Sequence, residues 1–175
     1  MSSRKIWLAG AVTAVVLATG GASYADDSPA EVPAPAAAPT ASPAPPKAGY
    51  SSTGTWQLLA LVNKRRHAAG LAPLTLDPKL ASIARSWVER MVARDALSHN
   101  DALFSRSSHA SLKMKALGEN VGWNYSVAAQ HAAFVNSPGH RSNLDMPGFR
   151  AAGFAVVRGA DGRIWSTEDF GTPKA

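Results

Sequence analysis

A segment rich in proline and alanine limits how much of this chain can fold. Residues 26–49 hold 7 Pro and 8 Ala and almost no large apolar side chain. Such a stretch cannot bury enough apolar surface to fold, and its prolines favour an extended, semi-rigid spacer. We therefore predict a spacer over residues 26–50 and one folded domain over residues 51–175. A domain of that length buries about two-thirds of its unfolded surface, which is enough for independent stability.

The residues before the spacer have the three-part layout of a secretory signal. Arg4 and Lys5 precede an apolar run from Ile6 to Ala18, and Ala22–Ala25 offers small residues to a signal peptidase. A transmembrane anchor is the alternative, but the run is shorter than the roughly 18–20 residues that span a bilayer. We predict a cleaved signal peptide over residues 1–25 and no transmembrane helix in the mature chain. The protein would then be secreted, either extracellular or held in the cell envelope.

The chain contains no cysteine, although its first residues predict export. Disulfides cannot stabilise the domain, so its hydrophobic core must suffice. Residues 51–175 hold 15 Lys/Arg and 9 Asp/Glu, a net charge of +6 that would attract anionic polymers. The basic residues are scattered and no aromatic residues alternate with them, which argues against nucleic acid as a partner. We expect a monomer.

Capping residues and apolar periodicity predict three helices. The first begins at Ser51–Thr53 and ends at Gly70, the second begins at Asp77-Pro78, and the third covers Ser126–Asn136. Each helix has one stripe that we expect to face the core. The three stripes are Trp56, Leu59, Val62 and Arg66; Leu80, Ala84, Trp87 and Met91; and Ala128, His131, Ala132 and Val135.

Extended structure is predicted mainly near the end of the chain. Gly153–Val157 and Ile164–Phe170 have the composition of strands, and Asp161-Gly162 between them is a hairpin turn signal. Glu119–Trp123 is a shorter extended segment, whereas residues 100–111 are polar and predict a long loop. Helices first and a hairpin last favour an α+β domain with helices packed on a sheet. We interpret Trp87, Trp123 and Trp165 as core residues.

Polar residues gather at three breaks between these elements: Ser98–Asn100, Gly118–Asn120 and Ser137–Asn143. The sequence has no phosphate-binding loop, no dinucleotide-binding motif, no HExxH and no Gly-x-Ser-x-Gly elbow. Without cysteine there is also no thiol nucleophile and no thiolate metal site. Any site must therefore use histidine, carboxylate and amide side chains from the three breaks.

The order of short motifs in the chain indicates a family. Gly118–Val121 reads Gly-Glu-Asn-Val, Ser137–Leu144 begins Ser-Pro-Gly-His-Arg, and Trp165–Gly171 ends in Glu-Asp-Phe-Gly. Together they resemble the CAP superfamily of cysteine-rich secretory, antigen 5 and pathogenesis-related proteins, and above all its cysteine-free bacterial secreted branch. The resemblance runs from about Leu58 to Gly171.

The resemblance implies a three-layer α-β-α sandwich with a central, mainly antiparallel sheet. It also implies a cleft lined by His99, Glu119 and His140. The residues implied in support of this cleft are Asn120, Arg141 and Glu168. The family's second acidic residue has no counterpart in the third predicted helix, and Glu168 stands where bacterial relatives usually carry Gln.

The implied cleft allows two kinds of chemistry. Two imidazoles and a carboxylate can serve as three ligands of Zn²⁺ or another divalent cation, with a fourth position for water. In that case His99, Glu119 and His140 would be the metal ligands. Alternatively no metal binds, and Glu119 fixes the tautomer of one histidine by accepting its hydrogen bond. Both alternatives stay open at this point.

Three functions follow from these alternatives. The first is a secreted CAP-domain protein that binds a ligand (a lipid, a glycan or a divalent metal) in the His/Glu cleft without catalysis. The second is a metal-dependent extracellular hydrolase of peptide, nucleic acid or cell-wall material, with Glu119 as base or metal ligand. The third is an interaction module of the cell envelope that uses its surface. We favour the first, because no nucleophile–base pair predicts a reaction class and a fold alone does not make an enzyme.

Overall fold

The computed structural model describes residues 48–174. The predicted signal peptide and most of the predicted spacer lie outside the described residues. The fold begins two residues before the predicted boundary, because Gly49–Tyr50 forms strand β1 and pairs antiparallel with Arg158 and Val157. This pairing uses main-chain groups at the edge of a sheet, which composition does not reveal. Among the described residues, no helix is both long and apolar enough to cross a membrane.

The first two predicted helices are confirmed. Helix α1 spans Ser52–Ala68, and the side chain of Ser51 accepts a hydrogen bond from its first turn. Gly70 follows it with a φ of +69°, the left-handed conformation expected after a helix. Helix α2 spans Pro78–Arg94, and the carboxylate of Asp77 accepts two main-chain N–H groups at its start.

Residues 100–111 are not the predicted loop. They form a 3-10 helix, η1 (Asp101–Phe104), and a short helix, α3 (Arg106–Ser111). The hydroxyl of Ser105 caps α3, and Leu103, which is 1% exposed, anchors the segment in the core. Elements this short are missed because they cannot show a repeating apolar stripe.

The third predicted helix is confirmed as α4 (Val127–Asn136), capped by Ser126. Pro138, just beyond it, starts a further helix, α5 (Pro138–Leu144), which was not predicted. The predicted core stripe of α1 is confirmed at Leu59, Val62 and Arg66 but wrong at Trp56, and the stripe predicted for α4 is wrong. Trp56 is 61% exposed, and α4 buries Val127, Gln130 and Phe134 instead of the predicted Ala128, His131, Ala132 and Val135. The predicted stripe counted small alanines as equal to the large ring of Phe134. The face of α4 that we predicted to be buried was therefore not the one that packs on the core.

The sheet has its strands in the order β1-β4-β5-β3, with β2 pairing parallel to β4. The further strands are β2 (Thr75–Leu76), β3 (Met114–Asn124), β4 (Ala151–Arg158) and β5 (Ile164–Pro173). Strands β4 and β5 form the predicted hairpin, and Gly162 in its turn has a φ of +84°. All pairs except β2 with β4 are antiparallel.

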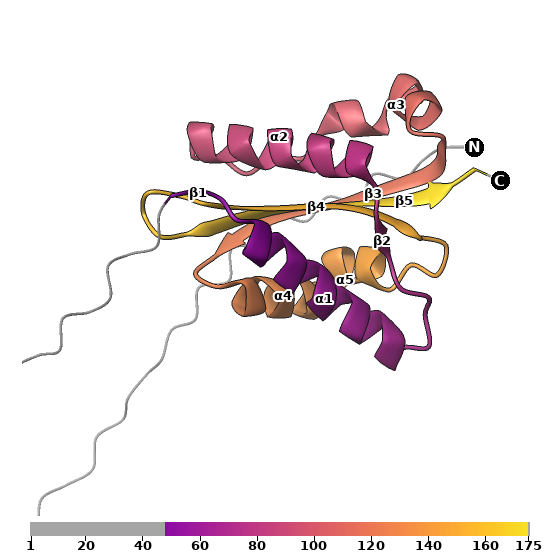
Figure 1. Ribbon diagram of the computed structural model, residues 1–175, viewed down its shortest axis with the longest axis horizontal. Coiled ribbons are helices and arrows are strands. Elements are labelled where there is room, and N and C mark those ends of the chain that lie inside the picture. Colours follow the sequence, from indigo (N-terminus) through magenta and orange to yellow (C-terminus); the bar gives the residue numbers. More distant parts are fainter. Residues whose placement is uncertain (1–47, 175) are drawn as a thin grey trace, which may run out of the picture. The chain divides into compact units, whose positions relative to one another are not determined.

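Helices cover both faces of this sheet, as Figure 1 shows. Helices α2 and α3 lie on one face, and α1, α4 and α5 lie on the other (Figure 1). The predicted α+β fold, a three-layer α-β-α sandwich around a mainly antiparallel sheet, is therefore confirmed.

The side chains of β5 alternate between the two cores. Trp165 packs in the cluster of α2, whereas Ile164 and Phe170 pack in the cluster of α1 and α4. Because successive strand residues face opposite ways, Glu168 points to the α1/α4 side and Asp169 to the α2 side. Two adjacent carboxyl groups in the sequence thus belong to different layers.

Candidate functional site

A buried carboxylate and a histidine form the centre of the site. The side chain of Glu119 is fully buried, and its Oε1 lies 2.7 Å from Nδ1 of His99. The main-chain N–H of Asn100 donates to the same oxygen at 2.9 Å. The hydrogen bond to Glu119 is the main cause that raises the pKa of His99, against the opposing effect of burial. Glu119 therefore favours the protonated imidazole.

The Gly-Glu-Asn segment divides its side chains between the two layers. A Cβ on Gly118 would lie 2.9 Å from the side chains of both Asn143 and Phe149, on the α5 side. By alternation Asn120 points the same way and Glu119 points to the α2 side. Glycine fits here because the side chains of Asn143 and Phe149 occupy the space that a Cβ would need.

Asn120 connects this strand to α5. Its side-chain amide donates to Oε2 of Glu168 at 2.9 Å and to the main-chain carbonyl of His140 at 3.2 Å. Asn143 in turn donates to Oδ1 of Asn120 at 2.9 Å and to the carbonyl of Glu119 at 3.0 Å. These bonds hold α5, and with it His140, against β3.

His140 lies near the Glu119–His99 pair but makes different contacts. Its Nδ1 is 2.8 Å from the hydroxyl of Ser137, and its ring centroid is 4.8 Å from that of Phe134. Burial lowers the pKa of His140, and the charge of His99 lowers it further. The two imidazoles are therefore close enough to interact, with His99 the more basic.

The metal-binding alternative was tested against this geometry. In the part of the chain that the structure describes, no three His, Asp or Glu side chains are arranged to hold a metal ion. Oε1 of Glu119 already hydrogen-bonds Nδ1 of His99 at 2.7 Å, so these two atoms are directed at each other and not at a shared cation. His99, Glu119 and His140 therefore do not fit the three-ligand zinc site considered from the sequence.

Two further carboxyl groups of β5 lie near the site, one on each side of the sheet. Glu168 is fully buried on the α5 side, and burial raises its pKa to about 8 despite the hydrogen bond from Asn120. Asp169 pairs with Glu119 across the strands, and burial and the charge of Glu119 raise its pKa well above the usual value. Sequence reasoning missed Asp169, although the register of the closing strand would have placed it opposite Glu119.

Arg141 lies apart from the pair. It is exposed, and its guanidinium donates to the main-chain carbonyl of Val135 at 3.4 Å. The nearby carboxylate of Asp145 pairs with Arg65 instead, at 2.6 Å. The structure thus connects Arg141 to the end of α4.

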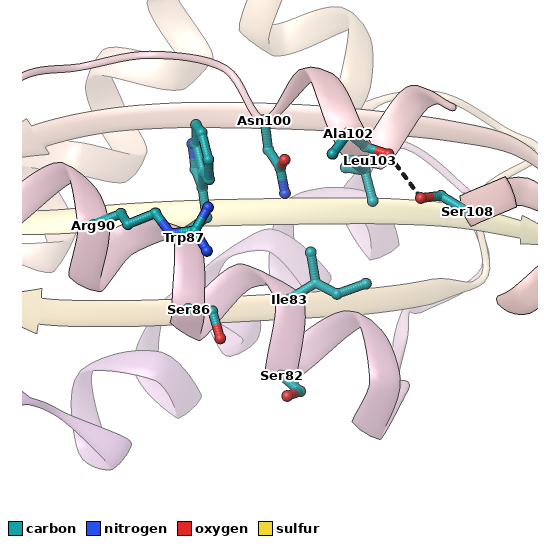
Figure 2. A pocket seen from close by; sticks show the side chains of 9 residues that line it. All are labelled: Ser82, Ile83, Ser86, Trp87, Arg90, Asn100, Ala102, Leu103 and Ser108. Atoms are coloured by element: carbon teal, nitrogen blue, oxygen red, sulfur yellow. Dashed lines mark hydrogen bonds between the residues drawn. The ribbon is translucent and has the colours of Figure 1, made fainter. Parts of the chain in front are cut away.

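A cavity of about 290 Å³ lies between α2 and the η1–α3 segment, and Asn100, whose main-chain N–H donates to Glu119, is one of its lining residues. Figure 2 shows Asn100 and Leu103 pointing from that segment toward α2. The lining residues are Ser82, Ile83, Ser86, Trp87, Arg90, Asn100, Ala102, Leu103 and Ser108. The side chain of Asn100 therefore faces the cavity, while its main-chain N–H donates to Glu119. On the α2 side, the indole N–H of Trp87 donates to the carbonyl of Ser98 at 2.7 Å.

The three tryptophans predicted to be core residues differ in how deeply they are buried. Trp87 is half-buried: it packs against the core cluster of α2, as predicted, and also lines the cavity. Trp123 is 39% exposed and is not the core residue predicted. Trp165 is 2% exposed, as predicted.

Comparison with known proteins gives relatives of this chain. The chain is 28% identical over 120 residues to the uncharacterized protein YkwD of Bacillus subtilis (strain 168), a match that covers 66% of this chain and 46% of YkwD. The chain thus spans less than half the length of this relative.

Solved structures share the fold. An outer surface protein from Borrelia burgdorferi is 18% identical with a TM-score of 0.63, over 73% of this chain and 100% of that one. An extracellular protein containing a SCP domain from Bacillus anthracis is 24% identical with a TM-score of 0.56, over 69% of this chain and 40% of that one. The model of the cysteine-rich secretory protein family, CAP, matches residues 59–170, well over half of the chain. The chain therefore belongs to the CAP family of cysteine-rich secretory proteins.

Proposed function

We propose that this chain is an exported CAP-domain protein that binds a ligand beside the Glu119–His99 pair and does not catalyse a reaction. The observation that carries the proposal is a fully buried carboxylate that raises the pKa of a histidine whose side chain is 33% exposed. Such a histidine places a positive charge at the surface when it is protonated. The buried partner keeps the ring in one orientation, so little ordering is needed on binding.

The chemistry of the site selects the class of ligand. A protonated His99 attracts a hydrogen-bond acceptor such as a carboxylate or phosphate. The adjoining cavity adds the hydroxyls of Ser82 and Ser86 and the guanidinium of Arg90. We therefore favour a small polar ligand with an acidic group over a purely apolar lipid tail.

Export is supported by two independent observations. The first 25 residues have the layout of a secretory signal. The printed descriptions of two relatives of the same fold name an extracellular protein and an outer surface protein. An extracellular or envelope location is thus the proposed place of action.

The binding proposal is tested by titrating the chain with inorganic phosphate and with N-acetylmuramic acid, a carboxylated wall sugar, while the histidine ring signals are followed by NMR. We expect the signals of His99 to shift, and His99→Gln to weaken binding roughly ten- to a hundredfold, the value of a lost charge-assisted hydrogen bond. Binding should weaken as the pH rises through the raised pKa of His99. His67→Gln, on the exposed surface of α1, is the matched control.

Equal affinities of the wild type and His99→Gln for both probes would contradict the binding proposal. Turnover of a wall, peptide or nucleic-acid substrate that disappears in His140→Ala would contradict the statement that the domain is not catalytic.

A further inference from the structure

A cluster of aromatic side chains lies at the end of β3, away from the Glu119–His99 pair. Trp123 and Tyr125 are 39% and 69% exposed, with ring centroids 6.1 Å apart and ring planes at 83°. The guanidinium of Arg163 lies 4.9 Å from the ring centroid of Trp123 and equally far from that of the buried Trp165. We call Trp123, Tyr125 and Arg163 the aromatic corner.

The backbone explains why the corner is exposed. Trp123 is two residues after Val121 in β3, so its side chain points to the same side of the sheet as that of Val121, which packs against α2. Tyr125 follows the end of β3, and its ring contacts that of Trp123. Helix α2 ends at Arg94, and Asp95 after it forms an ion pair with Arg163. The corner thus begins where the helix that covers this face stops.

The corner is held rigidly before any ligand arrives. Arg163 pairs with Asp95 and with Asp161, and its guanidinium contacts two indole rings. The carbonyl oxygen of the Asn124 side chain accepts the main-chain N–H of Tyr125 at 2.8 Å, which fixes the strand end. Preformed aromatic surfaces of this kind bind with little loss of side-chain entropy.

The charges at the corner select among the ligands that bind aromatic rings. The side chains of Asp95 and Asp161 are 71% and 44% exposed, whereas that of Arg163 is 20% exposed. Exposed carboxylates repel anionic phospholipids and nucleic acids, and they accept hydrogen bonds from hydroxyl groups. A pyranose ring of a neutral glycan offers both an apolar C–H face for the indole and hydroxyl donors for the carboxylates.

We propose that the aromatic corner binds a sugar ring of a neutral glycan, with the more exposed Tyr125 stacking on the ring, Trp123 contacting its edge and Asp161 accepting hydroxyl hydrogen bonds. This site is separate from the proposed ligand site at Glu119 and does not depend on it. It gives the domain a surface that holds on to polysaccharide.

The test titrates the chain with chitotetraose, cellotetraose and maltotetraose, and follows the indole N–H of Trp123 and the neighbouring amides by NMR. We expect at least one of these neutral glycans to shift those signals in a saturable way. Tyr125→Ala should weaken that binding roughly three- to tenfold, the value of one aromatic stacking contact. Trp56→Ala, which removes a similarly exposed ring from α1, should leave it unchanged.

Two further arms keep the proposal open to refutation. Asp161→Asn keeps both aromatic side chains and should also weaken binding, which covers the case that an aromatic variant fails to fold. Vesicles of phosphatidylglycerol, which the net positive charge of the domain attracts, should bind the wild type and Tyr125→Ala equally. The proposal is overturned if none of the three glycans shifts Trp123 up to about 10 mM, if Trp56→Ala loses as much affinity as Tyr125→Ala, or if vesicles bind the wild type but not Tyr125→Ala.

Discussion

Replacing the buried Glu168 by Gln should make the domain less sensitive to pH. Its pKa is raised from 4.5 to about 8 in the fold, because burial disfavours the charged carboxylate. Between these two values the unfolded chain has released the proton and the folded chain still holds it. The free energy of unfolding therefore falls as the pH rises from about 4.5 to about 8.

The size of this effect follows from the two pKa values. One pH unit corresponds to about 1.4 kcal/mol for a single proton. At pH 7 Glu168 is ionised in the unfolded chain, where its pKa is 4.5, but still protonated in the fold. This difference costs on the order of 3 kcal/mol of stability. Gln keeps the shape and the oxygen that accepts the hydrogen bond from Asn120, but it has no proton to lose. Glu168→Gln should therefore remove about 1.4 kcal/mol per pH unit from the slope.

The assay is urea unfolding of both proteins at about one-unit intervals between about pH 5 and about pH 8. The difference between the two slopes isolates Glu168, because every other titrating group is common to both proteins. Glu89→Gln is the control, since that carboxylate is 48% exposed and pairs with Arg85 on the surface of α2. Parallel plots for the wild type and Glu168→Gln would refute the reasoning, as would an equal change in Glu89→Gln.

Two further predictions concern packing. Arg66 is fully buried and donates to the carbonyls of Ala72, Leu144, Met146 and Phe149, so Arg66→Met should cost about 3–5 kcal/mol in guanidinium unfolding. A loss below about 1 kcal/mol would show that these carbonyls find other partners. A Cβ on Gly153 would lie 2.2 Å from the carbonyl carbon of Leu80, so Gly153→Ala should cost about 3 kcal/mol or more by thermal unfolding. Gly139→Ala, whose Cβ meets nothing within 4 Å, should change stability by less than about 1 kcal/mol, and equal effects of the two alanines would contradict this account.

Local signals explain why the helix starts could be predicted. Ser51, Asp77 and Ser126 cap α1, α2 and α4 with their own side chains, and each interaction spans only a few residues of sequence. The hairpin of β4 and β5 was likewise predictable from Asp161-Gly162. What failed was the choice of buried face where the stripe was weak, as at Trp56, because burial depends on which elements pack there.

The candidate site shows the same limit at longer range. Motif positions identified His99 and Glu119, which the fold brings into contact across twenty positions of sequence. Metal binding depends on the directions in which the side chains point, and a sequence motif does not give those directions. Asn120 and Glu119 are neighbours, but strand alternation sends one toward α5 and the other toward α2. Asp169 was missed for the opposite reason, because only the register of β5 against β3 places it beside Glu119.

The hydrogen bond from Asn143 to the main chain of Glu119 has a consequence for solubility. In the described part of the chain β3 is the outermost strand on its side of the sheet, and an exposed strand of that length would invite pairing with other molecules. The amide of Asn143 occupies a carbonyl of this strand, and the opposite margin is covered only by the two-residue strands β1 and β2. Asn143, which belongs to the family signature, thus removes one of the acceptors to which a strand of another molecule could bond.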